Sequence, residues 1–311
     1  MANTKNYYDF SDFLRKHFPY KVQKISVNGG FTCPNRDGSI GLGGCTYCNN
    51  QTFHPDYCQT TKTISEQLEE GIRFFSRKYP EMKYLAYFQA YTNTYDSLKN
   101  LQKKYEEALA YPGVVGLIIG TRPDCMPDEL LDYLSEKRKN HFILIEYGVE
   151  STLDSTLAHI NRGHTFQAAI DIIIRTAQYG ILNGIHLILG LPGEDRQQIL
   201  SHASRISDLP VNTLKLHQLQ IIKHTAMAKE YAEHPGRFRL YTPGEYASLI
   251  IDFVERLRPD IAIDRFISQS PKELLIAPDW GLKNHEFTNL INKEFEKRNT
   301  KQGVLYMQQN L

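Results

Sequence analysis

The chain has 311 residues, and its 36 lysines and arginines nearly balance 35 aspartates and glutamates, which leaves a formal net charge of +1. This balance argues against a polybasic scaffold for nucleic acid or membranes, and the length suits two domains or one extended α/β barrel. The first residues lack the apolar core of a secretory signal, and no apolar run reaches bilayer length. We therefore expect a cytoplasmic protein without membrane contact, whose five cysteines form no disulfide framework.

Short apolar runs rich in β-branched residues alternate with amphipathic segments along most of the chain. The predicted strands are residues 24–30, 84–91, 114–121, 142–149, 184–191 and 213–222, with a weaker seventh at 261–266. The predicted helices are residues 65–77, 96–109, 127–137, 152–159, 166–179, 195–208 and 243–256. Continuous apolar strands that alternate with such helices are typical of βαβ units in a parallel sheet.

Six or seven such units favour an α/β fold of the TIM type, a partial (β/α)6 barrel, over a short doubly wound sheet. We expect residues 1–23 to form an N-terminal extension, residues 24–266 the barrel, and residues 267–311 a C-terminal extension. Within the last of these, residues 294–301 carry mixed charge and are expected to be solvated. In a barrel, functional residues follow the carboxyl ends of the strands.

Three cysteines follow the first predicted strand with the spacing C-x11-C-x2-C, namely Cys33, Cys45 and Cys48. The close pair lets two thiolates converge on one centre, and the glycines around it let a loop fold over that centre. A tetrahedral zinc site needs a fourth ligand, which Cys58 or His54 offers. An iron–sulfur cluster held by three thiolates instead leaves one iron open for a small ligand. The spacing alone does not choose between zinc and cluster.

The cysteine segment resembles the cluster loop of the radical S-adenosylmethionine (SAM) superfamily, in the longer-spaced form of the Elongator catalytic subunit and its smaller bacterial relatives. This resemblance implies that Cys33, Cys45 and Cys48 hold a [4Fe–4S] cluster whose fourth iron takes the methionine moiety of SAM. Reductive cleavage of SAM at such a cluster gives methionine and a 5′-deoxyadenosyl radical. Tyr47, just before the last cysteine, is implied to lie near the adenine.

Two later motifs strengthen the resemblance. Gly148-Val149-Glu150-Ser151 is similar to the family's G-V-Q/E-S, and Asn161-Arg162-Gly163-His164-Thr165 to its N-R-G-H-T. The resemblance implies that Glu150 and Arg162 contact the ribose and the carboxylate of SAM. The chemistry fits, because a carboxylate accepts from ribose hydroxyls and a guanidinium clamps a carboxylate. Without these motifs, an exposed ion pair is the ordinary interpretation.

Other cofactor contacts implied by the resemblance are less regular. Leu191 lies in a G-L-P-G motif that approaches the adenine, and His186 stands where relatives carry another polar residue. A hydrogen-bonded core histidine is the alternative for His186. Gly120 replaces the glutamate of the family's E-T-R-P-D, and residues 89–94 lack the glycine-rich motif that holds the methionine amino group. We assign that contact to Gln89 and Thr94.

The catalytic residues are unknown from sequence, apart from a few candidates. Lys215 and Lys223 lie in a stretch that resembles the Elongator-type L-K-I-Y-P and are placed to meet an anionic substrate. Arg265, after the possible seventh strand, is a similar candidate. The alternative for both lysines and for Arg265 is an exposed position on the rim of the barrel without contact to substrate. Cys125 is a candidate hydrogen-atom donor, with an inert buried cysteine as the alternative.

Only 45 residues follow position 266, so we expect no acetyltransferase half like that of the larger relatives. The short members of this branch imply a tRNA substrate modified at the C5 substituent of the wobble uridine, with an electron donor such as flavodoxin or ferredoxin. One such reaction trims carboxymethylaminomethyl to aminomethyl. The first 24 residues interleave aromatic and basic side chains, which suits single-stranded RNA or, alternatively, packing under the barrel.

Two other functions stay open at this point. One is a radical SAM enzyme that acts on a small metabolite or a tetrapyrrole. The other is a non-catalytic RNA-binding protein stapled by zinc, with four ligands and no open coordination position. The sequence gives neither the oligomeric state nor the fate of SAM.

Overall fold

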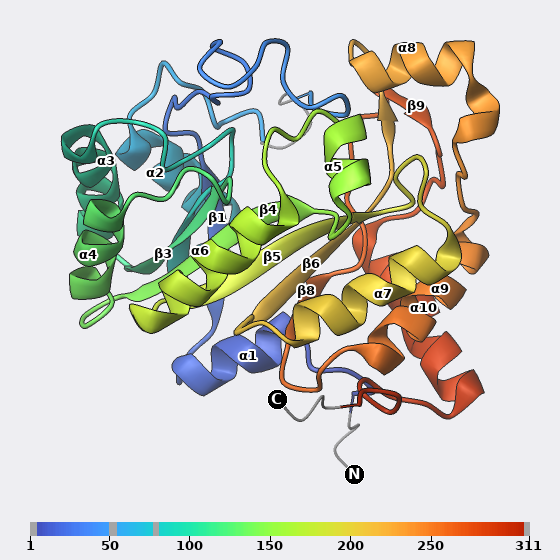
Figure 1. The fold of residues 1–311 in the computed structure, drawn as a ribbon. Helices are drawn as coiled ribbons and strands as arrows, with labels where there is room; N and C mark the ends of the chain where they lie inside the picture. The colour runs from blue at the N-terminus through green and yellow to red at the C-terminus, as the bar shows by residue number, and fades with distance from the viewer. Residues whose placement is uncertain (1–4, 50–54, 77–80, 308–311) are drawn as a thin grey trace.

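A computed structural model of the chain describes residues 5–49, 55–76 and 81–307. Its main sheet has the strand order β1-β2-β3-β4-β5-β6-β8, and every neighbouring pair is parallel. The sheet curls into a partial barrel with helices on its outside (Figure 1), which confirms the expected fold, including the weaker seventh strand. Its strands are β1 (Val22–Val27), β2 (Lys83–Phe88), β3 (Val114–Thr121), β4 (Phe142–Glu150), β5 (Leu182–Leu189), β6 (Thr213–Gln218) and β8 (Ala262–Arg265).

The helices form where the sequence combines an apolar face with residues that cap the helix ends. At the start of α9, the Thr242 hydroxyl accepts from the backbone N–H of Glu245, and the Glu245 carboxylate accepts in return from Thr242. After α6, Gly180 adopts a φ of +69°, which favours glycine and ends the helix. The helices are α1 (Phe10–His17), α2 (Ile64–Ser76), α3 (Leu98–Ala110), α4 (Asp128–Lys137), α5 (Asp154–His159), α6 (Phe166–Gln178), α7 (Arg196–Ser207), α8 (Ala226–Glu233), α9 (Pro243–Arg256) and α10 (Asn284–Arg298).

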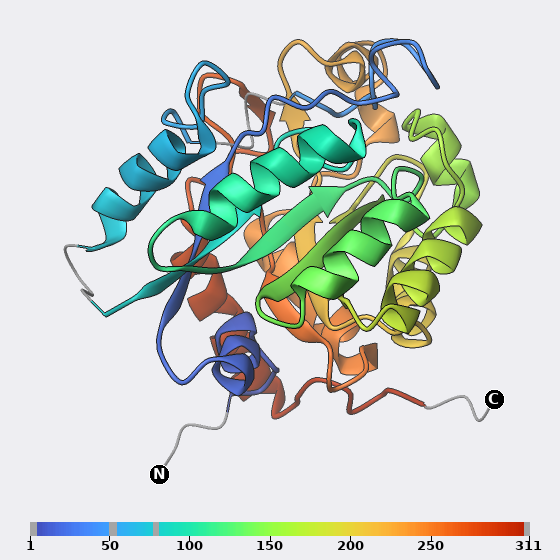
Figure 2. The same cartoon turned by 90° about the vertical axis from the view of Figure 1, so that its left-hand side faces the viewer.

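Helix α1 fills the amino end of the barrel, below the sheet in Figure 1 and at its base in Figure 2. Phe10 and Phe13 are buried there against Leu85 of β2 and Leu144 of β4. These two leucines share the inner face of their strands with residues that line the barrel cavity. Packing under the barrel therefore accounts for the buried aromatics of this segment, in place of the RNA contact that the sequence left open.

The chain after β6 differs from the prediction of one strand over residues 213–222. β6 ends at Gln218, because its side chain turns to the next segment and exchanges hydrogen bonds with the backbone of Ser268. The following β7 (Ile221–Ile222) pairs antiparallel with β9 (Leu275–Ala277) in a separate two-stranded sheet. The break leaves the carboxyl end of β6 open toward the barrel interior.

The C-terminal segment is also more ordered than predicted. Helix α10 buries Phe287, Ile291 and Phe295 against the core, so the expectation that residues 294–301 are merely solvated is wrong for its last turn. Apolar residues spaced by four lie on one face of a helix, which explains this packing. The boundaries of the terminal extensions stay predictions. Within the described residues, no helix is long and apolar enough to cross a membrane.

Candidate active site

A cavity lies at the carboxyl ends of the barrel strands, beneath the loop between β1 and α2 that carries the three cysteines. Parallel strands bring residues that are far apart in sequence to this one edge. Nine of the residues singled out from the sequence line the cavity: Cys33, Cys45, Cys48, Tyr47, Gln89, Glu150, Arg162, His186 and Arg265.

The cysteine loop is held by its own backbone and by the segment after α5. The Cys48 N–H donates to the Cys45 carbonyl at 3.0 Å, which closes the turn between the paired cysteines. The Thr46 N–H donates to the Ile160 carbonyl at 3.0 Å, and the Asn161 side chain donates to the Gly44 carbonyl at 2.8 Å. The loop is therefore fastened across the barrel to the segment that carries Arg162.

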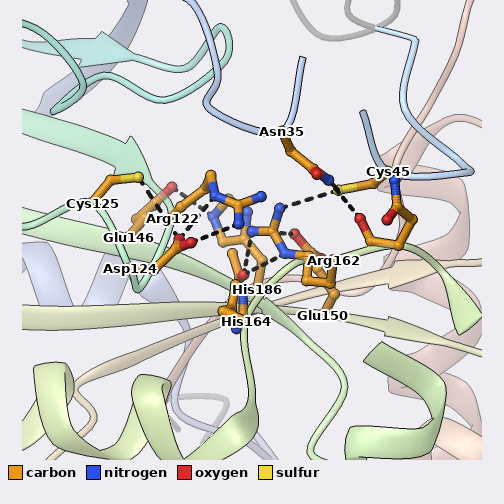
Figure 3. A network of polar contacts seen from close by, with 12 residues as sticks. Asn35, Cys45, Arg122, Asp124, Cys125, Glu146, Glu150, Arg162, His164 and His186 are labelled. Atoms are coloured by element: carbon orange, nitrogen blue, oxygen red, sulfur yellow. Dashed lines mark hydrogen bonds and ion pairs between the residues drawn. The ribbon is translucent and has the colours of Figure 1, made fainter. Parts of the chain in front are cut away.

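Nitrogen donors surround the thiol of Cys45 (Figure 3). Arg162 Nη1 lies 3.4 Å and Asn35 Nδ2 lies 3.6 Å from Cys45 Sγ. Arg36 donates to the Cys48 carbonyl at 2.9 Å. Burial raises the pKa of Cys48 to about 11, with Cys45 adding to the effect, while Arg36 opposes it. Cations and N–H donors beside cysteines stabilise thiolates and the sulfurs of an anionic cluster, so the surroundings fit a [4Fe–4S] cluster.

Cys58, the alternative zinc ligand, does not line the cavity with the other three cysteines. Its thiol donates to the Ser26 carbonyl at 3.1 Å and is buried against β1. His54 lies outside the described residues. Among the described residues, no three His, Cys, Asp or Glu side chains are grouped around one metal-ion position. A cluster held at three separate corners does not need its thiolates to meet at one point.

Glu150 and Arg162 meet at the end of β4. The register of β4 against β5 shifts between Gly148 and Glu150, and Glu150 has a φ of +68°. This irregular strand end turns the Glu150 carboxylate to within 3.8 Å of Arg162 Nη2. Arg162 also donates through Nε to the Gly148 carbonyl at 3.2 Å. Burial raises the pKa of Glu150, and the Arg162 charge opposes that shift. Only 8% of the Arg162 side chain and 12% of the Glu150 side chain are exposed, unlike an ordinary surface ion pair.

The deepest part of the cavity wall is ionic. His186 Nε2 lies 2.8 Å from Glu146 Oε2, and Lys215 Nζ donates to the same carboxylate at 2.6 Å. Both charged groups are buried, and Lys215 also lies 3.3 Å from Asp264. Burial lowers the pKa of His186 to about 4, helped by the Lys215 charge, so its imidazole is neutral at pH 7. Lys215 thus forms part of a buried network under the cavity, and it is not on the cavity wall.

Four further candidates from the sequence are also absent from the wall. The Thr94 hydroxyl is buried 2.5 Å from the hydroxyl of Thr121, and it is Thr121 that lines the cavity. Cys125 is buried, with its thiol 3.8 Å from Asp124, and Leu191 is buried in the core. Lys223 is exposed. The structure therefore does not bring Thr94, Leu191, Lys223 and Cys125 to the cavity where the other predicted residues meet.

Sequence reasoning missed several polar residues of the cavity wall, among them Tyr91, Arg122, Glu146 and His217. Glu146 could have been predicted from the sequence, because a carboxylate inside the apolar strand 142–149 requires a buried partner. Arg122 and His217 left a weaker signal, since each lies at the carboxyl end of a strand. Tyr91 could not have been predicted from the sequence, because its position depends on a backbone φ of +60° that only the folded loop shows.

The chain matches the model of the Radical SAM superfamily over residues 30–206 and that of the Radical_SAM C-terminal domain over residues 211–297. It is 36% identical over 306 residues to the uncharacterized protein YtqA of Bacillus subtilis (strain 168), covering 98% of this chain and 94% of that protein. It is 27% identical over 177 residues to a tRNA uridine(34) acetyltransferase of Dehalococcoides mccartyi (strain CBDB1), covering 55% of this chain and 36% of that protein.

Among solved structures, the archaeal Methanocaldococcus infernus Elp3 with an N-terminal deletion aligns with a TM-score of 0.68. The alignment covers 91% of this chain and 64% of that chain at 16% sequence identity, so it supports the fold alone.

The chain belongs to the radical SAM superfamily. It is a radical SAM enzyme, with a [4Fe–4S] cluster and SAM as its cofactors, and its sequence is similar to the Elongator-like branch. This membership decides the question that the cysteine spacing left open in favour of the cluster, and it excludes the non-catalytic zinc-stapled protein.

Proposed function

We propose that this enzyme modifies the C5 substituent of the wobble uridine in tRNA, with trimming of carboxymethylaminomethyl to aminomethyl as the reaction that suits the family resemblance. The observation that carries the proposal is the sequence similarity to proteins named tRNA uridine(34) acetyltransferase. A tRNA substrate would place the enzyme in the cytoplasm. Breaking the C–H bond beside nitrogen would need a radical, which is the chemistry that the cluster and SAM would supply when bound. With the cluster taking up the second electron, water would hydrolyse the resulting imine, so that the C–N bond breaks, the two carbons leave as glyoxylate and the aminomethyl group remains.

In this proposal, different residues of the cavity bind the cluster and SAM. Cys33, Cys45 and Cys48 hold the cluster. Glu150 and Arg162, which lie beside each other at the end of β4, orient SAM through hydrogen bonds to its ribose and carboxylate. The loop that covers the cavity excludes water from the reacting atoms. A donor such as flavodoxin or ferredoxin delivers the electron.

The cavity mouth offers a surface for a nucleobase. Tyr91 lines the cavity and keeps 39% of its surface exposed. The Arg36 guanidinium lies 5.8 Å from the centre of its ring, which places a cation beside an exposed aromatic face. Unstacked bases of single-stranded RNA loops bind to such aromatic and arginine surfaces. This arrangement supports an anticodon base as the occupant of the mouth.

The test compares tRNA nucleosides by mass spectrometry from the source organism, from a strain without the gene, and from strains that carry the wild-type gene or a Cys33→Ala version. We expect a wobble-uridine precursor to accumulate without the gene, to disappear with the wild-type gene, and to persist with Cys33→Ala. An unchanged wobble-uridine profile contradicts the proposal. An altered tetrapyrrole or metabolite pool with normal tRNA favours the alternative substrates.

A further inference from the structure

The cofactor contacts proposed above leave one side of the cavity without a role. They come from the cysteine loop and from the segments between β2 and β5, whereas His217 ends β6 and Arg265 ends β8. Register explains why these two meet, since Lys215 pairs with Arg265 across the β6–β8 ladder and His217 lies two residues further along β6. Arg265 Nη2 donates to His217 Nε2 at 2.9 Å.

The Arg265 guanidinium has unused hydrogen-bonding capacity. Its Nε is shielded from solvent and has no hydrogen-bond partner among the described residues. Arg265 cannot lose its proton in a protein, so its charge is permanent. Leaving a buried donor of a charged group unsatisfied is costly, and such a group in a native structure calls for an explanation. A bound ligand that accepts from Nε provides one.

The charge of Arg265 is not neutralised by its neighbours. The carboxylates nearest in the network, Glu146 and Asp264, already face the two ammonium groups of Lys24 and Lys215. These two anions and two cations cancel. His217 adds no negative charge, because burial and the Arg265 charge lower its pKa well below the ordinary value and keep the imidazole neutral. The cavity therefore carries one uncompensated positive charge at this side.

Neutral polar groups complete this side of the cavity. Gln220, Ser268 and Ser270 line it together with Arg265. Both serine hydroxyls donate to Gln220 Oε1, at 3.2 and 2.8 Å, which orients the amide so that its NH2 group is free to donate elsewhere. Guanidinium and amide donors around one space are the usual partners of a carboxylate.

We propose that Arg265 binds a carboxylate of the substrate and selects a wobble uridine whose C5 substituent is acidic over one whose substituent is uncharged. This inference rests on the proposed tRNA function and assigns its specificity to a residue of β8. Lys215 and Lys223 are not available to bind this carboxylate. Lys215 is already paired with Glu146 in the buried network, and Lys223 is exposed outside the cavity. The carboxylate of SAM is the competing occupant, and the experiment separates the two.

The experiment uses two anticodon stem-loop RNAs that differ only in the wobble uridine, one with C5 carboxymethylaminomethyl and one with the corresponding carboxamide. The anaerobically reconstituted wild-type enzyme should show a kcat/KM about 10- to 100-fold higher for the acid than for the amide. Arg265→Gln should reduce this ratio to within about threefold of one, and Arg265→Lys should retain part of it. Arg15→Gln, which removes a surface charge on α1, serves as the matched control and should keep the wild-type ratio.

Three results overturn the inference, and they differ from failure of the proposed function. Equal turnover of acid and amide by the wild type, or a ratio that survives in Arg265→Gln, removes Arg265 as the selecting residue. A dissociation constant for SAM raised tenfold or more in Arg265→Gln, measured by equilibrium dialysis without RNA, assigns the residue to the cofactor carboxylate. Thermal unfolding and iron content of each variant show whether it has folded. Absence of turnover of both RNAs by the wild type refutes the tRNA function itself.

Discussion

Arg162 connects the parts of the site that the chain supplies from distant positions. Its guanidinium contacts the Cys45 thiol, the Gly148 carbonyl and, at 3.8 Å, the Glu150 carboxylate. Its neighbour Asn161 is bonded to the cysteine loop. A change at Arg162 therefore disturbs the cluster loop and the end of β4 together, so its effect on activity does not report a single contact.

The three cysteines of the cavity can be separated from the two others by substitution. We expect Cys33→Ala to lower iron and sulfide content after anaerobic reconstitution and to abolish reductive cleavage of SAM to 5′-deoxyadenosine, because the cluster loses one of three protein ligands. Cys58→Ser is the matched control, since its hydroxyl can still donate to the Ser26 carbonyl. Normal 5′-deoxyadenosine formation by Cys33→Ala contradicts the ligand assignment.

Gly148 is a second sensitive residue, because the guanidinium packs against its backbone. A Cβ atom at Gly148 would lie 2.7 Å from Arg162 Nη2 and 2.6 Å from Glu150 Oε1. We expect Gly148→Ala to raise the dissociation constant for SAM by about tenfold or more, since both proposed contacts must move. Gly244→Ala on α9, whose Cβ would meet open space, is the control. Unaltered SAM binding by Gly148→Ala would exclude Glu150 and Arg162 as cofactor contacts.

His186 makes the stability of the protein depend on pH. Its pKa is about 4 in the folded chain, through burial, and about 6.5 when unfolded. Between these values the unfolded state binds more protons, so stability is lost as pH falls from about 6.5 toward about 4, by on the order of 3 kcal/mol. Urea unfolding at several pH values measures this loss, which His186→Gln should reduce. An identical pH dependence in the variant contradicts the assignment.

At the scale of elements, an ion pair joins the two edges of the open barrel. β1 and β8 are the outer strands of the sheet, and Lys24 Nζ of β1 lies 2.6 Å from the Asp264 carboxylate of β8. Asp264 also faces the buried Lys215, so one carboxylate contacts two cations. Lys24 and Lys215 oppose the penalty of burial and lower the pKa of Asp264, which keeps it charged. Because β1 and β8 do not pair with each other, these ion pairs connect the two edge strands of the sheet.

The network predicts an unequal cost for two similar substitutions. Asp264→Ala leaves the buried Lys215 and the half-buried Lys24 with Glu146 as their remaining carboxylate, and we expect it to destabilise the protein by about 3 kcal/mol. Glu136→Ala breaks a pair with Lys139 whose side chains are 70% and 60% exposed, so it should cost less than about 0.5 kcal/mol. Urea unfolding at pH 7 compares them. Equal effects would mean that the β1–β8 ion pair does not hold the barrel edges together.

Elements with local signals were predictable, and those that depend on distant partners were not. The strand 114–121 and the helix 243–256 match their predicted bounds because apolar periodicity and capping residues are local. The break after Gln218 depends on Ser268, which lies 50 residues away. Helix α10 could have been found, since the spacing of its three buried apolar residues is visible in the sequence.

In the molecule as a whole, sequence motifs predicted the side of the cavity that carries the cysteines, whereas the other side became apparent only from the folded structure. Cys45, Glu150 and Arg162 lie in segments that resemble a family, so their convergence could be anticipated. The pairing of Lys24 with Asp264 joins positions 240 residues apart, and no motif marks either residue. Arg265 was named from the sequence only as a residue after a possible strand, and its contact with His217 follows from the pairing of β6 with β8.

Radical cleavage of SAM and modification of tRNA by this enzyme can be tested together in one measurement. Purified enzyme with a reconstituted cluster, SAM, a reduced flavodoxin and tRNA from the strain without the gene are incubated anaerobically. We predict that 5′-deoxyadenosine forms and that the mass of the wobble nucleoside changes in step with it, whereas tRNA from the wild-type strain is left unaltered. Formation of 5′-deoxyadenosine with no change in any tRNA nucleoside would contradict the account.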